Sequence, residues 1–440
     1  MRHFFACVAA GLLLSPLARA QTDFVPDGPS TVWIALCCVL VLLMTPALAL
    51  FYGGLARRKN VLNTMLMSFI ALGVISLVWL CLGFSIAFGS GNGWFGGLDF
   101  LWGSGISMAE PYPLSIDAEG KSSHVIPGGL FMLFQMMFAI ITPALISGAV
   151  AERMKFGAYV AFIVLWSLLV YAPIAYWVWN PGGWLFNMGA LDFAGGAVVH
   201  LSSGAAALAC ALSLGRRESV RRHEPVVPNN LTLTLLGAGL LWVGWIGFNA
   251  GSALAMDTIA LNAFLATQLG AAGGMLGWLL AERVQTGKAT ALGAASGLVA
   301  GLVGITPAAG FVEPLPGFVI GAIAGGLCYL AIGLKRRIGY DDALDVVGVH
   351  GVGGLVGALL TGVFASTVAN PAVEAALANG RGALLGVQAA AVGAVLAYSL
   401  GVTWIIMKAL QLTMGIRVAP EAEEAGLDLA EHGEEGYYFA

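Results

Sequence analysis

Two histidines interrupt long apolar runs of the chain, and each follows an aspartate. In LDFAGGAVVH, Asp192 precedes His200 by eight residues, and in LDVVGVHGVGG, Asp345 precedes His350 by five. A neutral imidazole carries one hydrogen-bond donor and one acceptor. Two such rings side by side would share one hydrogen bond and offer a polar, uncharged lining to a small solute. In the alternative, each histidine separately bonds a helix carbonyl, and the residue types leave both arrangements open.

Asp192 stands near the start of its apolar run. At a helix N-terminus its carboxylate would accept hydrogen bonds from free N–H groups, and this capping role is the simpler interpretation. In a second interpretation, its negative field also favours a cation nearby. Because eight residues of helix rise by roughly 12 Å, Asp192 would not touch a solute beside His200. The same separation argues against an acid–base pair of an intramembrane enzyme, and we expect no enzymatic activity.

The composition places these residues in a membrane. Of the 440 residues, 59% are hydrophobic and 10% are charged, whereas a soluble domain has about 25% charged residues. The chain is therefore expected to be an all-α polytopic membrane protein. The net charge of −4 indicates no particular partner, and we expect no nucleic acid. The six cysteines show neither a disulfide framework nor metal-ligand spacing, so we expect no metal and no cofactor.

The first residues are typical of a leader. Arg2 precedes an apolar stretch shorter than the ~20 residues that a membrane span needs. Ala18 and Ala20 then supply a small-x-small cleavage pattern. We expect a secretory signal peptide over 1–20, rather than an additional span, which leaves the mature N-terminus outside the cytoplasm.

Eleven apolar runs are long enough to span a bilayer, and their flanking charges orient them. Lys and Arg gather after every odd-numbered run, as in RRK 57–59 and KRR 335–337, and the alternate loops contain few of them. This pattern indicates an outer N-terminus and an inner C-terminus in the cytoplasmic (inner) membrane. The expected spans are 31–56, 61–88, 127–151, 156–179, 191–215, 230–252, 258–281, 289–308, 316–334, 344–367 and 382–409.

Spans one to five and six to ten form two blocks of equal size. Since five is odd, the second block starts on the opposite face, as in inverted repeats that build a site at the membrane midplane. We expect repeat one at about 31–215, repeat two at about 230–367 and an eleventh helix at about 382–409, within a transmembrane domain of 31–410. The acidic segment 415–440 remains, and its composition by itself favours a disordered end.

Three phenylalanines have notable positions. Phe134 and Phe138 are four residues apart on one face of the third span, and Phe248 lies in WVGWIGFNAGSA of the sixth. By composition alone, packing is the simpler explanation for all three. The residues by themselves thus indicate a transporter or channel with histidines at its core, and they name no solute.

Five stretches together resemble one family. GALDFAGGAVVHLSSG at 189–204, WIGFNAGSA at 245–253 and DDALDVVGVHGVGG at 341–354 are similar to motifs of the ammonium transporter (Amt/Mep/Rh) family. FQMMFAIITPALISGAVAERMKF at 134–156 and AGLVGITPAAGFV at 300–312 resemble its third and eighth helices. The similarity runs in order along nearly the whole chain. The family's fold, eleven helices with a five-plus-five inverted repeat, agrees with the spans counted above.

The resemblance implies roles for the matching residues. Phe138 and Phe248, with Phe134 beside them, match the phenylalanines that close the pore. His200 and His350 match the twin histidines that line it.

The resemblance also implies an outer recruitment site for the cation. Asp192 matches the acidic residue near that site, and Trp179 and Ser252 match the aromatic and hydroxyl groups that hold the cation. The stretch WVWNPGGWLFN offers Trp177 and Trp184 as well, and we favour Trp179.

The implied mechanism follows from the cost of dehydrating a cation. Ammonium has N–H donors for the Ser252 hydroxyl, and Trp179 would supply a cation–π contact of ~0.5–2 kcal/mol. Stripping a whole cation of water costs many times that amount. Ammonium, unlike potassium, escapes this cost by losing its proton. We expect deprotonation near the phenylalanine pair and passage of ammonia past the two histidines, and we leave open whether the proton follows separately.

Partners follow from the same resemblance. It implies a homotrimer in membrane lipid, with methylammonium as a substrate analogue. EEAGLDLAEHGEEGY in the acidic tail resembles the cytoplasmic tail of bacterial members, which docks a PII-type nitrogen-signalling protein. The alternatives are an ammonium-sensing receptor, which we would expect to carry an added soluble module, and a neutral gas or water channel.

Overall fold

The computed structural model describes residues 24–116 and 121–437. Within these ranges the chain forms helices, turns and isolated bridges, and no strand. Ten helices, some built from consecutive segments, are long and apolar enough to cross a membrane, and a shorter apolar helix covers Ala291–Ile305. The expected all-α polytopic class is thus confirmed. The signal peptide expected at 1–20 lies outside the described residues.

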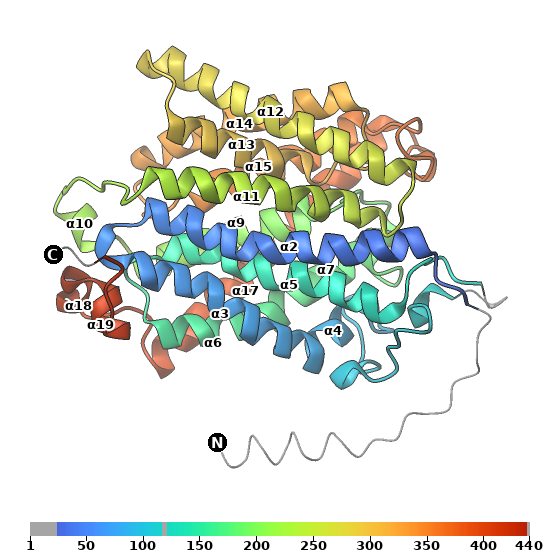
Figure 1. The fold of residues 1–440 in the computed structure, drawn as a ribbon, viewed down its shortest axis with the longest axis horizontal. Helices are drawn as coiled ribbons and strands as arrows, with labels where there is room; N and C mark the ends of the chain where they lie inside the picture. Colours follow the sequence, from blue (N-terminus) through green and yellow to red (C-terminus); the bar gives the residue numbers. More distant parts are fainter. Residues whose placement is uncertain (1–23, 117–120, 438–440) are drawn as a thin grey trace, which may run out of the picture.

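The long helices run roughly along one direction (Figure 1). Several continue through a π-helical turn, labelled η, so that one span combines two or three elements. The elements of the bundle are α2 (Gly28–Leu55), α3 (Val61–Val78), η2 (Trp79–Gly83), α4 (Phe84–Phe88), α5 (Gly128–Val150), α6 (Phe156–Trp166), η5 (Ser167–Tyr171), α7 (Ala172–Trp179), η6 (Gly196–Leu201), α9 (Ser202–Leu214), α11 (Leu231–Ala250), α12 (Thr258–Thr286), α13 (Ala291–Ile305), α14 (Pro314–Ile338), η8 (Val347–Gly351), α15 (Val352–Phe364) and α17 (Arg381–Thr413).

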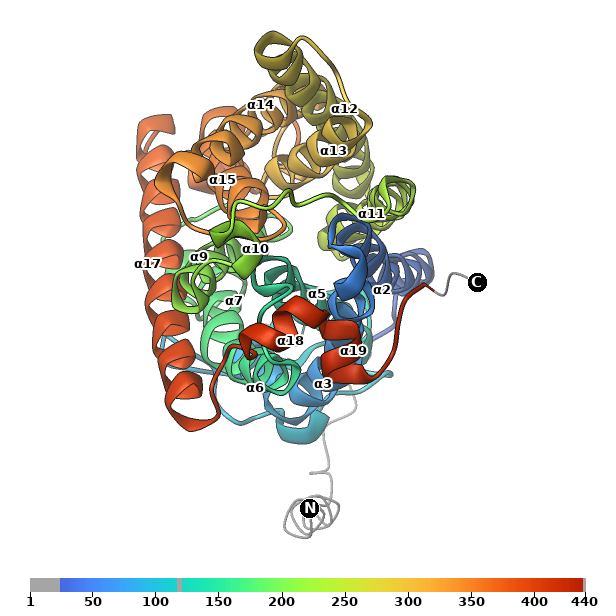
Figure 2. The same ribbon diagram turned by 90° about the vertical axis from the view of Figure 1, so that its left-hand side faces the viewer.

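The two ends of the bundle differ. Two short helices near the C-terminus, α18 (Pro420–Ala425) and α19 (Leu427–His432), lie at one end (Figure 1), which we call the tail end; the opposite one is the distal end. In the view onto the tail end, most long helices are seen nearly end-on, and α17 runs steeply across one side (Figure 2).

A buried charge network joins the loops at the tail end. Glu152, which is fully buried, pairs with Arg57 at 2.7 Å and with Arg217 at 3.0 Å, and Arg217 pairs with Asp341 at 2.9 Å. Burial raises the pKa of the Asp341 carboxyl, but the hydrogen bonds and the charge of Arg217 outweigh burial and lower that pKa to about 2. Because the charges are paired, the loops after α2, α5, α9 and α14 are held together.

The acidic tail packs against the bundle. The Asp428 carboxylate accepts hydrogen bonds from the backbone N–H groups of Leu62 (3.1 Å) and Asn63 (2.8 Å) at the start of α3. Glu431 accepts from the N–H of Phe156 at the start of α6, at 2.9 Å. Leu427 and Asp428 are buried. The prediction of a disordered end, which composition alone favours, is therefore wrong for the described part of the tail. The carboxylates of this part cap helices of the bundle.

Replacing Asp428 with alanine should loosen this tail. The substitution removes the acceptor for two N–H groups, a capping loss of about 1–2 kcal/mol. We expect trypsin to cut after Arg417 about tenfold faster, as measured by limited proteolysis of the purified protein. The exposed Glu434 provides the control, since Glu434→Ala should be cleaved at the wild-type rate. Equal cleavage of Asp428→Ala and wild type would show that the carboxylate does not hold the tail.

Candidate functional site

The two histidines meet inside the bundle. Their Nδ1 atoms are 3.2 Å apart, and the rings lie nearly parallel, with centroids 5.2 Å apart and an interplanar angle of 27°. His200 is held by η6 and His350 by η8, and both are buried. Of the two arrangements that the residue types left open, the structure has the shared hydrogen bond.

Aspartates start both of these helices. The Asp192 carboxylate accepts four backbone hydrogen bonds, from Gly195 and Gly196 at 3.0 and 2.6 Å and from Ala197 and Val198 at 2.9 and 3.0 Å. Because this cap lies before the helix, the fifth span begins at Gly196 rather than at the expected 191. The hydrogen bonds of Asp192 are therefore those of a helix cap.

The counterpart of Asp192 in the second half is Asp342, not Asp345. The Asp342 carboxylate accepts from the N–H of Val347 at 2.7 Å, at the start of η8, and it precedes His350 by the same eight residues. Asp345 instead pairs with Lys335 and has a φ of +64°. The aspartates of the two LD pairs are therefore not equivalent, and the equivalent aspartate of the second half lies three residues before Asp345.

Close helix contact and stacking position the rings. A Cβ on Gly204 would lie 2.3 Å from the Cα of Gly351, so only glycine permits this crossing of α9 with η8. His200 stacks on Trp245 with centroids 5.3 Å apart, and the Trp245 indole donates to the Thr306 hydroxyl at 2.8 Å.

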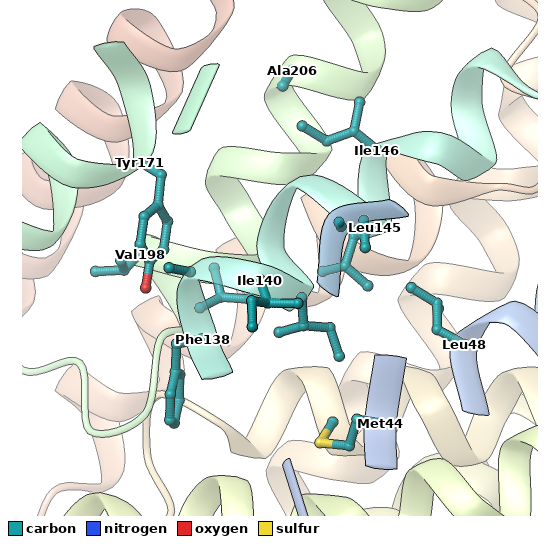
Figure 3. Close-up of a cluster of buried hydrophobic side chains, with 14 of the residues drawn as sticks. Met44, Leu48, Phe138, Ile140, Leu145, Ile146, Tyr171, Val198 and Ala206 are labelled. Atoms are coloured by element: carbon teal, nitrogen blue, oxygen red, sulfur yellow. The ribbon is translucent and has the colours of Figure 1, made fainter. Parts of the chain in front are cut away.

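A narrow cavity of about 20 Å³ adjoins the histidine pair. Such a volume holds about one water-sized molecule. Met44 and Leu48 of α2 and Leu145 of α5 line this cavity. Figure 3 shows these three side chains within a cluster of buried hydrophobic residues. His200 Nε2 is buried and has no hydrogen-bond partner within the described residues. The other lining residues are Phe51, Tyr52, Ile141, Val199, Leu241, Trp245, Phe248, Ser296, Val299, Leu344, Val349 and His350.

Two phenyl rings separate this narrow cavity from the distal end. Phe138 and Phe248 are buried, with ring centroids 4.3 Å apart and an interplanar angle of 36°. Phe248 lines the narrow cavity, and Phe138 lines a cavity on the distal side. Phe134 packs edge-on against Phe138 at 5.0 Å and lines neither of these cavities.

The distal cavity has a volume of about 280 Å³ and is lined by two of the three expected recruitment residues, whereas Asp192 does not line it. Trp179 and Ser252 both line it. The Trp179 indole donates to the backbone oxygen of Asp192 at 2.9 Å, and the Ser252 hydroxyl donates to Phe248 O at 2.9 Å. Trp177 packs against other aromatic side chains instead and does not line this cavity.

A third cavity opens toward the tail end. Its volume is about 470 Å³, and it shares Phe51, Ser296, Leu344 and Val349 with the narrow cavity. Glu282 also lines it. The described residues thus form a wide distal cavity, a phenyl barrier, a narrow apolar cavity with two histidines, and a second wide cavity, in this order.

Known proteins are similar to this chain in sequence and in fold. Residues 32–437 match the model of the Ammonium Transporter Family. The chain belongs to that family. It is 48% identical over 408 residues to the ammonium transporter of Bacillus subtilis, which covers 92% of this chain and 98% of that protein. It is 42% identical over 414 residues, 93% of this chain and 99% of the relative, to ammonium transporter Amt1 of Archaeoglobus fulgidus.

Solved structures with the same fold are also similar to this chain. Mep2 of Saccharomyces cerevisiae superposes with a TM-score of 0.81 and 37% identity, over 90% of this chain and 88% of that one. A structure described as a sensor Amt protein has a TM-score of 0.82 and 29% identity, over 92% of this chain and 98% of that one.

Several cavity residues of this ammonium transporter family member were not singled out in the sequence. Trp245 stacks on His200, and its spacing of three residues from Phe248 was an available signal. Gln135 and His124 line the distal cavity. Gln135 shares a helix face with Phe138, three residues on, whereas His124 lies in a loop and carries no periodic signal.

Proposed function

We propose that this chain carries ammonium across the membrane by passing ammonia through the narrow cavity. The cation is recruited in the distal cavity by Trp179 and Ser252 and loses its proton near Phe138 and Phe248. The neutral molecule then passes the histidine pair. The observation that carries the proposal is the narrow apolar cavity beside two imidazoles bonded to one another.

Energetics favours an uncharged permeant. A cation–π contact with Trp179 is worth about 0.5–2 kcal/mol, which is far below the cost of stripping a cation of water in an apolar passage. Because the two rings share a hydrogen bond between their Nδ1 atoms, each keeps a polar edge for ammonia without adding a net charge. Potassium has no proton to lose, so the phenyl barrier and the narrow cavity exclude it.

We infer that the tail end faces the cytoplasm. The basic clusters 57–59 and 335–337 flank the loops joined there, which fits the positive-inside rule. The distal cavity then opens outward in the cytoplasmic membrane. Eleven crossings, α13 included, put the N-terminus of α2 outside and the tail inside.

The decisive experiment is uptake of methylammonium by proteoliposomes, with and without a membrane potential. Uptake that a potential accelerates, together with a current, would indicate that the proton follows by a separate route. Uptake without current would indicate a neutral gas channel. A purified protein that takes up no methylammonium would contradict the proposal.

Replacing Ser252 with alanine should weaken recruitment. The hydroxyl is the acceptor for one N–H of the cation, and a hydrogen bond to a charged group is worth about 1.5–3 kcal/mol. We expect the KM for methylammonium uptake to rise on the order of tenfold, with little change in the maximal rate. Ser104→Ala, at an exposed serine outside the cavities, is the control. An unchanged KM in Ser252→Ala would remove this hydroxyl from the site.

An ammonium-sensing receptor is the second candidate function. The likeness to the structure described as a sensor Amt protein favours it. The proteoliposome experiment separates the two, because a receptor that only binds the cation would saturate without uptake.

We also propose that the tail docks a PII-type signalling protein and that the chain forms a homotrimer. The ordered packing of α18 and α19 against the starts of α3 and α6 supports a defined docking surface at the tail end. Purified PII-type protein should bind the full chain in membrane vesicles and should not bind a chain ending at Arg417. Binding to the shortened chain would remove the tail from this role.

A further inference from the structure

Two buried polar atoms of the distal cavity have no hydrogen-bond partner in the described ranges. They are Gln135 Oε1 and His124 Nδ1. Both residues line the cavity that also contains Trp179 and Ser252. Buried polar atoms are bonded in the great majority of cases, and an unbonded one needs an explanation. Two of them in one cavity point to a ligand that donates hydrogen bonds.

Both side chains are held in place by the surrounding structure. Gln135 lies on α5, one helical turn after Phe131 and three residues before Phe138, so the three share a face. The His124 ring is stacked on Tyr112, with centroids 5.6 Å apart at 29°, and lies 4.8 Å from the ring of Phe131. The His124 N–H donates to the Ser122 hydroxyl at 3.0 Å, and that hydroxyl donates to His124 O at 2.9 Å.

Both groups are neutral acceptors at ordinary pH. Burial lowers the pKa of His124 to about 4, so its ring is uncharged and one ring nitrogen keeps a lone pair. An amide oxygen has two lone pairs. Ammonium has four N–H donors in tetrahedral directions, and one serine hydroxyl satisfies only one of them. Further acceptors in the same cavity are therefore needed to replace the lost water.

We propose that Gln135 Oε1 and His124 Nδ1 accept N–H bonds from the cation held by Trp179 and Ser252, and so complete the recruitment site. This inference rests on the proposed function, since it requires that a cation with N–H donors enters the distal cavity. Gln135 and His124 contribute affinity for that cation and take no part in the later passage of ammonia.

Substitutions that remove only the acceptor test the proposal. Gln135→Met and His124→Phe keep the approximate shape, whereas Gln135→Glu and His124→Asn keep an acceptor. In proteoliposomes, the KM for methylammonium should rise on the order of tenfold in each of the first two, with the maximal rate within about twofold of wild type. Gln135→Glu and His124→Asn should have a KM within about threefold of the wild-type value. Gln411→Met, at an exposed position near the end of α17, is the matched control and should behave as wild type.

The outcomes separate the inference from the proposed function. If wild type takes up methylammonium and Ser252→Ala raises the KM, but Gln135→Met and His124→Phe do not, the inference is overturned and the function stands. If all four variants lose uptake together with thermal stability, the residues are structural, and the inference is again overturned. If wild type takes up no methylammonium, both fail.

Discussion

Ammonium uptake is expected to fall at least about a hundredfold when Asp192 is replaced by alanine. The carboxylate accepts four backbone N–H bonds at 2.6–3.0 Å, and it is nearly fully buried. The substitution leaves these donors without their acceptor, which costs roughly 3–5 kcal/mol when several buried donors are unpaired together. The start of η6 then loosens, and His200, four residues into the same helix, loses its position beside His350.

Uptake and thermal stability should be measured on the same preparation. Asp192→Asn retains one carbonyl acceptor and should show an intermediate loss in both. Asp257 provides a matched control, because its carboxylate caps α12 through Ala260 N–H at 2.9 Å and is exposed. The Asp257→Ala substitution should lower the free energy of unfolding by about 1 kcal/mol and leave uptake at the wild-type rate. Wild-type uptake by Asp192→Ala would remove this residue from the mechanism.

Replacing His200 with leucine should reduce ammonia passage at least about thirtyfold. Leucine is apolar, so it removes the hydrogen bond to His350 and one polar edge of the narrow cavity. Ammonia entering from water would then leave hydrogen bonds unreplaced, at a cost of about 2 kcal/mol or more. A barrier higher by 2 kcal/mol slows the passage by about thirtyfold. The readout is the maximal rate of methylammonium uptake in proteoliposomes that contain equal amounts of protein.

The matched control is His223→Asn, at an exposed histidine with a φ of +58° that asparagine also tolerates. Its uptake should equal that of wild type. The KM of His200→Leu should change little, because recruitment takes place on the far side of the phenyl pair. Wild-type rates in His200→Leu would show that the imidazole pair does not assist passage, and the role assigned to the narrow cavity would be lost.

The membrane class and the approximate spans could be predicted from the chain alone, because length, apolarity and flanking charge are local properties. The helix caps were partly predictable for the same reason. Asp192 was placed correctly at a helix start, but Asp345 was compared with it, and only the hydrogen bond to Val347 identifies Asp342 as the counterpart. Both aspartates precede an apolar run, and the letters alone do not show which one faces the free N–H groups.

The tail is another case where composition misled. The number of carboxylates in the tail favours a solvated, disordered end. In the structure, however, Asp428 accepts hydrogen bonds from two N–H groups at the start of α3, more than 360 residues earlier in the chain. A composition argument contains no information about such distant donors. The described tail is ordered because helices elsewhere need caps.

The residues that carry the proposed chemistry were largely identified from the order of amino acids and from family resemblance, but their arrangement depends on the folded bundle. His200 and His350 are 150 residues apart in sequence, and they meet because Gly204, which has no Cβ, lets α9 approach the backbone of η8 at Gly351. Local propensity places each histidine within a helix; long-range packing decides whether the two rings share a hydrogen bond. The same packing turns Trp179 toward the distal cavity, keeps Trp177 out of it, and brings Gln135 and His124 together beside Phe131.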